Sequence, residues 1–530
     1  MHRPHGRAIR AVAIAAATGA TLALVPAGAV AAAPATQGCQ ARTNNTVAKL
    51  LECVSATGAR THLEALQDIA DRNGGTRAAG LPGYEASVDY VTRTLRAAGW
   101  KVSIDEFPYT FVGPSTLQQV APVTATYPTG PYTGTGFGDV TATVTPVDLA
   151  LDPPRASTSG CEADDFAGFP AGNIALVQRG TCNFSVKAIN AEAAGASAVI
   201  LFNQGNTPDR EGLITGTLGG NDVVDIPVVG GSFSDGVALA QPGSRARVFV
   251  PSPEPRPQKN VIAELPGVND DNVVMAGAHL DSVQAGPGIN DNGSGSASLL
   301  ELAQKMAKVK PQNTVRLAWW GAEESGLIGS TEYVAGLSQA EKDRIALYLN
   351  FDMVASPNYI FMVYDGDESG FKAPVVVPDG SVAIEDLFES YFTKVGQPYD
   401  DAEFSGRSDY QAFINNGIPA GGLFTGAEVV KSPEQQAIWG GVAGESFDQC
   451  YHAACDDIGN VDMKALDVNI DAIALAVLAY SYSTQAVNGV PGASVPGGLD
   501  LPAPAGPEES WSAGGGGLAH DHSHGPSANG

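Results

Sequence analysis

The chain has 530 residues, of which 44% are hydrophobic and 16% charged, a balance typical of a packed globular protein with roughly two or three domains. Disordered chains carry fewer apolar residues and more charge, so most of this chain should fold. The formal net charge of −27 repels phosphate backbones and anionic membranes, which argues against a nucleic-acid or membrane-surface protein.

Residues 1–33 have the composition of a secretory signal peptide. A basic start runs from Met1 to Arg10, an Ala/Val/Leu run follows, and small residues precede Pro34. A membrane anchor is the alternative, but the apolar run is shorter than the ~20 residues that a span needs. No later stretch is long and apolar enough to cross a bilayer, so we expect a secreted, extracellular protein without a membrane partner.

Two helices are predicted between Val54 and Trp100, where apolar residues recur at helical spacing, and Gly99 should end the second. After Phe107 the sequence becomes rich in Thr, Val, Pro and Gly, which predicts a mostly β module up to about Val250. The proline-rich stretch 251–257 is typical of a stiff boundary.

Beyond this boundary, strand-like and helix-like segments alternate. Strands are predicted at 271–278, 314–320, 345–350 and near Gly422, and helices at 295–306, 384–395 and 463–482. Such alternation predicts a mixed, mostly parallel sheet flanked by helices, with sites where strands end in loops. From Gly489 to Gly530 the sequence is rich in Gly, Pro and Ser, so we expect a disordered tail. Its motif from His520 to His524 would at most capture metal weakly.

The six cysteines form three pairs that are close in sequence: Cys39 with Cys53, Cys161 with Cys182, and Cys450 with Cys455. In an exported protein these pairs predict three disulfides. Six cysteines allow many connectivities, so closeness in sequence is only a guide. A zinc–thiolate site is the competing interpretation, which the absence of any C-x-x-C motif disfavours.

Histidines and carboxylates stand at the ends of the predicted strands. His279 ends one strand, the acidic residues Asp291, Glu323, Glu324 and Asp352 lie in loops after strands, and His452 follows later. A lone histidine in such a place is more often structural, but buried carboxylates without a counter-charge are costly and a cation would remove that cost. Nitrogen and oxygen ligands together suit zinc better than calcium or an iron–sulfur cluster.

Several segments resemble peptidase family M28, especially the secreted Streptomyces-type aminopeptidases. The similarity covers roughly residues 50–108 and 258–486, and several motifs in the same order are more specific than any one fragment. The resembling segments are Asn73–Arg77, Gly80–Val91, Gly277–Ser282, Gly288–Gly295, Trp320–Ser330, Asn350–Met353, Ser405–Tyr410 and Cys450–Cys455. The resemblance implies the zinc-exopeptidase fold, an α/β domain.

Carried over to this chain, the resemblance implies a pair of zinc ions bridged by Asp291. His279 and Asp352 would complete one zinc site, and Glu324 and His452 the other. Each metal would keep an open position for water or substrate.

Further residues receive roles from the same resemblance. Asp281 would orient the His279 imidazole, or else cap a turn. Glu323 would act as general base and then as proton donor to the leaving amine. Tyr451 would donate a hydrogen bond to the tetrahedral oxyanion, with plain packing as the alternative. A Cys450–Cys455 disulfide would hold Tyr451 and His452 in fixed relation.

Recognition of the substrate is expected from two other residues. The backbone near Arg407 would help hold the free ammonium group, unless Arg407 is only an ion-pair residue. Phe424 would line a pocket for a large hydrophobic side chain, with core packing as the alternative. A calcium ion is a further expectation, because Asp467 and Asp471 match part of the calcium site of the Streptomyces-type enzymes.

A second resemblance concerns the middle of the chain. The segments 161–166, 172–184 and 191–203 resemble a protease-associated (PA) domain. We therefore expect a PA domain at 111–252, inserted between two parts of a peptidase domain at 39–110 and 258–486. The insert contains no histidine, which argues against a catalytic site of its own. A role as a lid or substrate gate is therefore a hypothesis.

The sequence thus predicts a secreted, monomeric metallo-aminopeptidase that removes large hydrophobic N-terminal residues from peptides through water activated by two zinc ions. One alternative is a zinc carboxypeptidase or dipeptidase of the same fold, because zinc ligands do not say which peptide terminus is held. The other is a catalytically inactive peptide-binding or receptor protein, which the presence of every ligand and the base disfavours.

Overall fold

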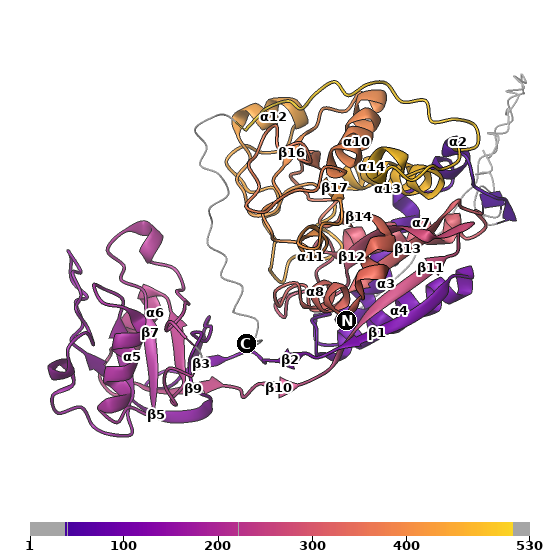
Figure 1. Ribbon diagram of the computed structural model, residues 1–530. Coiled ribbons are helices and arrows are strands. Elements are labelled where there is room, and N and C mark those ends of the chain that lie inside the picture. Colours follow the sequence, from indigo (N-terminus) through magenta and orange to yellow (C-terminus); the bar gives the residue numbers. More distant parts are fainter. Residues whose placement is uncertain (1–37, 40, 221, 512–530) are drawn as a thin grey trace, which may run out of the picture.

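The computed structural model describes residues 38–39, 41–220 and 222–511 (Figure 1). The expected signal peptide and the His520–His524 motif lie outside these described residues. In Figure 1 the chain forms a larger body and a smaller one, joined by two thin strands. No helix within the described ranges combines the length and hydrophobicity that a membrane span requires.

The larger body, which corresponds to the expected peptidase domain, is built on a mixed sheet of eight strands. In spatial order these are β1 (Lys101–Phe107), β11 (Gln258–Leu265), β13 (Asn313–Trp320), β12 (Asn269–His279), β14 (Ile345–Phe351), β17 (Ala420–Phe424), β15 (Met362–Tyr364) and β16 (Asp400–Ala402). Strand β12 pairs in parallel with β13 and β14, β14 with β17, and β15 with β16, while the other pairs are antiparallel. The predicted mixed α/β fold is confirmed.

Helices cover both faces of this sheet because alternate residues of its buried strands point to opposite sides. Val274 and Ala276 of β12 pack on one face, whereas Met275 packs on the other. The first face carries α3 (Ala56–Arg72), α4 (Pro82–Ala98), α7 (Gly293–Met306), α10 (Ser381–Val395) and α13 (Met463–Tyr482), and the second α8 (Ile328–Gly336) and α11 (Tyr410–Ile414). The short helices are α2 (Val47–Leu51), α9 (Gln339–Arg344), α12 (Pro433–Trp439) and α14 (Gln485–Asn488).

The helix ends explain why these segments stop where they do. Helix α4 begins with Pro82 in its first turn and ends at Gly99, whose φ of 96° is the left-handed conformation that glycine adopts without strain. Helix α7 begins at Asn292, whose side chain accepts a hydrogen bond from the backbone N–H of Gly295. The stop predicted at Gly99 is confirmed.

The smaller body, the inserted domain, contains a second sheet of seven strands. In spatial order these are β4 (Ala125–Tyr127), β3 (Thr116–Ala121), β9 (Arg245–Val250), β5 (Gly138–Val147), β6 (Ile174–Gln178), β7 (Ala198–Phe202) and β8 (Val228–Gly231). Its helices are α5 (Phe184–Ala193) and α6 (Phe233–Leu239), with 3₁₀ turns at Ala163–Phe166 and Pro208–Arg210. Strand β2 (Thr110–Phe111) pairs with β10 (Glu254–Pro255), so the chain leaves and re-enters the peptidase domain at one place.

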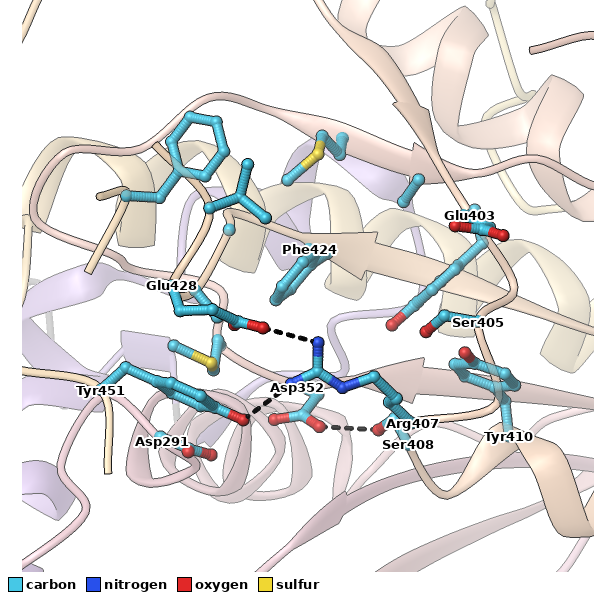
Figure 2. A pocket seen from close by; sticks show the side chains of 18 of the residues that line it. Asp291, Asp352, Glu403, Ser405, Arg407, Ser408, Tyr410, Phe424, Glu428 and Tyr451 are labelled. Atoms are coloured by element: carbon cyan, nitrogen blue, oxygen red, sulfur yellow. Dashed lines mark hydrogen bonds and ion pairs between the residues drawn. The ribbon is translucent and has the colours of Figure 1, made fainter. Parts of the chain in front are cut away.

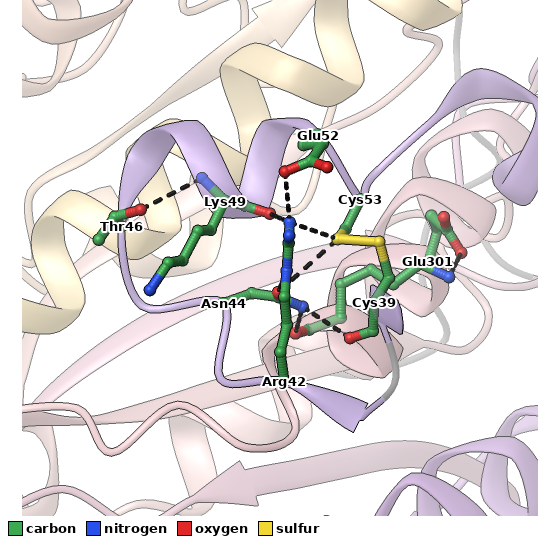
Figure 3. Close-up of a disulfide and its surroundings, with 9 residues drawn as sticks. Cys39, Arg42, Asn44, Thr46, Lys49, Glu52, Cys53 and Glu301 are labelled. Atoms are coloured by element: carbon green, nitrogen blue, oxygen red, sulfur yellow. Dashed lines mark hydrogen bonds and ion pairs between the residues drawn. A yellow bond between two sulfur atoms is a disulfide. The ribbon is translucent and has the colours of Figure 1, made fainter. Parts of the chain in front are cut away.

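All three expected disulfides are present, Cys39–Cys53, Cys161–Cys182 and Cys450–Cys455, and none of the described residues is a free cysteine. The zinc–thiolate interpretation is therefore wrong. Figure 3 shows the first disulfide, next to which the Asn44 amide donates to the carbonyls of Cys39 and Lys305. This contact ties the start of the described chain to the end of α7.

The prediction of disorder from Gly489 onward is wrong for residues 489–511. Ser510 donates to the Asp400 carboxylate, the Glu508 N–H donates to the carbonyl of Tyr399, and Val495 is buried. This C-terminal segment passes α10 and reaches α12 (Figure 1), where the Gln435 amide donates to Ser510. The Gly- and Pro-rich composition suggested disorder, but this segment is held by hydrogen bonds to the neighbouring surface. Such hydrogen bonds leave no periodic pattern of apolar residues in the sequence.

Candidate metal centre

The predicted metal ligands come together at the carboxyl ends of three neighbouring parallel strands. Strand β12 ends at His279, the loop after β13 carries Glu323 and Glu324, and Asp352 follows β14 directly. Loops before α7 and α13 bring Asp291 and His452 to the same place. Neighbouring parallel strands end at one edge of a sheet, so residues far apart in sequence meet there.

Asp291 lies between the two histidines. Its Oδ1 is 3.2 Å from Nε2 of His279, and its Oδ2 is 3.3 Å from Nε2 of His452. Asp352 Oδ1 is 3.3 Å from Nε2 of His279, and Glu324 Oε2 is 3.0 Å from Nε2 of His452. The five side chains therefore form two groups that share the Asp291 carboxylate.

Burial makes this concentration of carboxylates unfavourable without cations. Asp291 and Glu323 are each 5% exposed, and Oε1 of Glu324 and Oδ1 of Asp352 are buried without a hydrogen-bond partner. Burial raises the pKa of Glu323 well above its usual value, and burial with the neighbouring Asp291 raises the pKa of Glu324 to about 7. Unpartnered buried carboxylate oxygens beside imidazole nitrogens are the donor set that zinc prefers, so these residues fit zinc.

Asp281 contacts this site in two ways. Its carboxylate accepts hydrogen bonds from the backbone N–H groups of Glu323 and Glu324, at 3.2 and 3.4 Å. The acceptor closest to Nδ1 of His279 is the main-chain oxygen of Asp281 at 3.1 Å, while its carboxylate lies 3.6 Å away. Asp281 thus fixes the loop that carries both glutamates and also contacts the imidazole.

Sequence reasoning missed the residues that support the ligands. Ser408 donates a 2.6 Å hydrogen bond to Oδ2 of Asp352 and accepts one from the amide of Asn350 (Figure 2). Asp456 accepts hydrogen bonds from the backbone N–H groups of Asn290 and Asp291. In the sequence, the only indication of a role for Asp456 was its position directly after Cys455.

Arg77 is a second kind of support that the sequence did not reveal. It is fully buried, and its guanidinium donates to the carbonyls of Pro287, Leu280 and Gly288. These carbonyls belong to the loop between His279 and Asp291. A buried cation therefore holds the two ends of the loop that presents both ligands.

Tyr451 and Arg407 lie beside the metal centre. Arg407 donates to the Glu428 carboxylate at 2.7 Å and to the Tyr451 hydroxyl at 3.3 Å, as Figure 2 shows. The Tyr451 ring stacks on the imidazole of His452, with centroids 3.8 Å apart. The Cys450–Cys455 disulfide closes the loop that carries both rings.

A pocket opens beside these residues. Figure 2 shows Phe424 and Tyr451 in this pocket, together with Asp291 and Asp352. Its larger apolar and aromatic lining residues include Met353, Met362, Tyr364, Phe371, Phe424, Val429, Phe447 and Trp511. Among the described residues, those that line this pocket all belong to the peptidase domain or the C-terminal segment, and none to the inserted domain.

Asp467 and Asp471, the expected calcium ligands, lie one turn apart on α13. Burial and the charge of Asp467 raise the pKa of Asp471 to about 7. Neither residue belongs to the four groups of three or more potential metal ligands found within residues 38–39, 41–220 and 222–511. Calcium at this pair stays a prediction.

An α/β fold with paired imidazole–carboxylate groups at parallel strand ends defines a metal-dependent hydrolase of the zinc-peptidase class. A family model for peptidase family M28 matches residues 260–477, and one for the PA domain matches 140–239. The chain belongs to peptidase family M28 and carries a PA domain, which indicates a zinc-dependent hydrolase acting on peptide N-termini.

The individual relatives and solved structures that this chain resembles include aminopeptidases. An aminopeptidase of Pseudomonas aeruginosa is 51% identical over 448 residues, with 83% of each chain covered. Leucine aminopeptidase 2 of Trichophyton rubrum is 46% identical over 335 residues, covering 62% of this chain and 66% of the relative. The solved structure of a zinc aminopeptidase from Bacillus subtilis superimposes with a TM-score of 0.59 at 26% identity, covering 82% of this chain and 98% of that one.

Proposed function

We propose that this chain is a secreted aminopeptidase that removes large hydrophobic N-terminal residues from peptides with the help of two zinc ions. The observation that carries the proposal is the position of Asp291, whose two oxygens face the imidazoles of His279 and His452. A carboxylate that faces two separate imidazole groups is arranged to bridge two metal ions.

The two groups divide the ligands. His279 and Asp352 would hold one zinc ion, Glu324 and His452 the other, and Asp291 both. When bound, a zinc pair supplies an activated water and polarises the scissile carbonyl.

Glu323 is suited to move protons in this reaction. It lines the pocket, it is almost fully buried, and its Oε2 lies 3.8 Å from Nε2 of His279. Burial raises its pKa, so Glu323 holds a proton more readily than an exposed glutamate does. We assign it proton removal from water and proton delivery to the leaving amine.

Tyr451 is suited to stabilise the negative oxygen that develops on the scissile carbonyl. Its hydroxyl faces the pocket and lies 3.3 Å from Nη2 of Arg407, so Arg407 holds the phenol in place. A fixed hydroxyl donor beside the metal centre favours the tetrahedral state over the planar substrate.

The acidic lining of the pocket suits a free N-terminus. Asp352, Glu323 and Glu403 place carboxylates there, which attract an ammonium group and would repel a C-terminal carboxylate. This charge favours aminopeptidase over carboxypeptidase action. Cleavage of a free but not of an N-acetylated peptide is the expected outcome, and the reverse preference would favour the carboxypeptidase alternative.

The apolar lining suits a large hydrophobic residue at the substrate N-terminus. Phe424 lies among Met362, Phe447 and Trp511, and the similarity to a leucine aminopeptidase points the same way. A panel of aminoacyl-nitroanilides should show leucine and phenylalanine cleaved faster than lysine or glutamate. Equal rates across the panel would contradict this role of the pocket.

Chelation tests the whole proposal. Activity on leucine-nitroanilide should disappear with a strong chelator and return on adding zinc, with two zinc ions recovered per chain. A protein that keeps its activity without metal, or an intact zinc-loaded protein with no activity on any nitroanilide, would contradict it. The second result would favour the inactive peptide-binding alternative.

Secretion and a monomeric state belong to the same proposal. Three disulfides are typical of proteins that fold in an oxidising compartment outside the cytosol. The mature N-terminus in culture medium and the mass in solution would test both statements.

A further inference from the structure

A second group of buried carboxylates lies beside the substrate pocket, and one of its members, Asp401, lines that pocket. Glu385 and Glu389 come from α10, and Asp401 comes from the edge strand β16. Each offers one oxygen, and these three oxygens lie within 4.8 Å of one another. The three residues are 4%, 7% and 3% exposed, so water solvates their charges poorly.

No basic side chain within residues 38–39, 41–220 and 222–511 forms an ion pair with any of these three carboxylates. The Asp401 Oδ1 atom is buried and has no hydrogen-bond partner, although Asp401 faces the other two carboxylates. Burial, together with the charges of neighbouring carboxylates such as Asp367, raises the pKa of Glu385 to about 9 and the pKa values of Glu389 and Asp401 to about 7. The group therefore lacks the positive charge that buried carboxylates require.

The loop after β15 adds carboxylates at the same place. Asp365, Asp367 and Glu385 form an overlapping group of three potential ligands, in which Asp367 is exposed. Asp365 already accepts hydrogen bonds from the N–H groups of Ser369, Gly370 and Phe371. Backbone N–H groups thus satisfy much of the charge of Asp365, and those of Gly366 and Asp367 donate to Oε2 of Glu385, whereas Oδ1 of Asp401 has no partner. Glu385, Glu389 and Asp401 therefore form a buried group that no basic side chain of the described residues neutralises.

We propose that Glu385, Glu389 and Asp401 bind a calcium ion, at a site separate from the metal centre and from Asp467 and Asp471. All the donors are oxygens, which calcium prefers and which do not favour zinc. Oxygens on opposite sides of a calcium ion are about 4.6–5.2 Å apart, twice the usual bond length, so three oxygens that all lie within 4.8 Å of one another can contact one ion. A cavity of about 550 Å³, lined also by Asp367 and Glu509, leaves room for water ligands.

The position of this site gives the ion a structural task. Phe371 and Trp511 line both the calcium cavity and the substrate pocket, and their rings meet edge to face at 6.1 Å. Ser510, next to Trp511, donates to Asp400, next to Asp401. An ion held by α10 and β16 would therefore stiffen the wall against which a substrate side chain packs.

Calcium titration of the full-length, zinc-loaded protein tests the proposal without substrate. Isothermal titration calorimetry should show calcium binding to the wild type and loss of one calcium equivalent in Glu389→Gln/Asp401→Asn. The matched control Asp467→Asn/Asp471→Asn should keep that equivalent, and magnesium should bind more weakly to the wild type. Wild-type protein that binds no calcium at millimolar concentration, or binding unchanged in the first variant, would overturn the proposal.

A second measurement covers the case in which the double variant does not fold. Terbium replaces calcium at oxygen sites and emits when a nearby tryptophan is excited, and Trp511 lines the cavity. Sensitised terbium emission should appear with wild-type protein, should be competed away by calcium and should fall in Trp511→Phe. Emission that calcium does not reduce would overturn the proposal. Because neither experiment measures peptide cleavage, its failure would leave the aminopeptidase proposal standing.

Discussion

The two sheets of this molecule share a local architecture but differ in the side chains at the ends of their parallel strands. In the peptidase domain, β12, β13 and β14 are buried and lead into imidazoles and carboxylates. In the inserted domain, β6, β7 and β8 are equally buried and parallel, but β6 ends at Gln178, and Asn203 and Gln204 come directly after β7. The same geometry therefore carries imidazoles and carboxylates in one domain, and in the other buried amides with the half-buried Arg179 after β6.

Hydrogen bonding explains the difference. The Gln178 amide donates to the carbonyls of Ala150 and Gln204 and accepts from the Ala150 N–H. Asn203 donates to the carbonyl of Gly212, and Gln204 to that of Arg155. In contrast, Glu324 and Asp352 each keep a buried oxygen without a partner. Amides satisfied by backbone stabilise a fold, whereas unsatisfied buried carboxylates indicate a site for a cation.

The largest expected effect on the rate is that of replacing Glu323, the proposed proton-transfer residue. Glu323→Gln keeps size and shape but cannot accept a proton, so kcat on leucine-nitroanilide should fall by about 10²–10⁴-fold. Zinc content should stay unchanged, because Glu323 is not assigned as a ligand. Glu332→Gln, on α8, is the matched control and should keep full kcat. A Glu323 variant with nearly wild-type turnover would remove this residue from the mechanism.

The next effect concerns the hydroxyl beside the metal centre. Tyr451→Phe removes one donor to the developing oxyanion and should lower kcat by about 10²-fold, with KM changed much less. Tyr127→Phe in the inserted domain removes a hydroxyl that donates to Gln119 and should leave kcat unchanged. If Tyr451→Phe raised KM alone, Tyr451 would bind substrate instead of stabilising the reacting oxygen.

A third variant places a carboxylate at the end of β6, where the inserted domain carries an amide. Gln178→Glu replaces a donating amide by a carboxylate and removes the donor to the buried carbonyl of Gln204 and to the part-buried carbonyl of Ala150. The buried carbonyl alone should cost about 1–3 kcal/mol in the free energy of unfolding. Chemical denaturation should show this loss, whereas Gln241→Glu at an exposed position should show little. A Gln178→Glu protein as stable as wild type would mean that the amide bonds do not distinguish the two sheets.

The smallest expected effect is that of removing the inserted domain. Strands β2 and β10 lie side by side, so residues 112–253 can be replaced by a short Gly–Ser turn. Hydrolysis of leucine-nitroanilide should change little, because the lining of the pocket excludes the insert. A slower rate on long peptides alone would support substrate gating, and unchanged rates on long and short substrates would contradict that hypothesis.

The sequence predicted elements better than contacts between them. Long periodic segments such as 463–482, the strand that ends in His279 and the strand before Asp352 were recognisable because periodicity and motif agree locally. Arg77 stands in a resembling segment, yet nothing local indicates that its guanidinium reaches carbonyls more than 200 positions later. Such contacts depend on how the segment before α4 lies against the loop between His279 and Asp291, which no local pattern encodes.

Two parts of the molecule show this limit most clearly. The C-terminal segment was predicted as disordered, although Trp511 lines the substrate pocket. The Glu385, Glu389 and Asp401 group draws on a helix and an edge strand, where acidic residues look like ordinary surface positions in the sequence. Only the three-dimensional structure, in which α10 packs beside the sheet edge formed by β15 and β16, reveals that these residues are buried together.

Crystallography at the zinc absorption edge would test the central claim most directly. We predict two anomalous peaks per chain, one beside His279 and Asp352 and one beside Glu324 and His452, with Asp291 contacting both. A single peak in zinc-saturated crystals, or two peaks of which either lies away from Asp291, would contradict the two-zinc account.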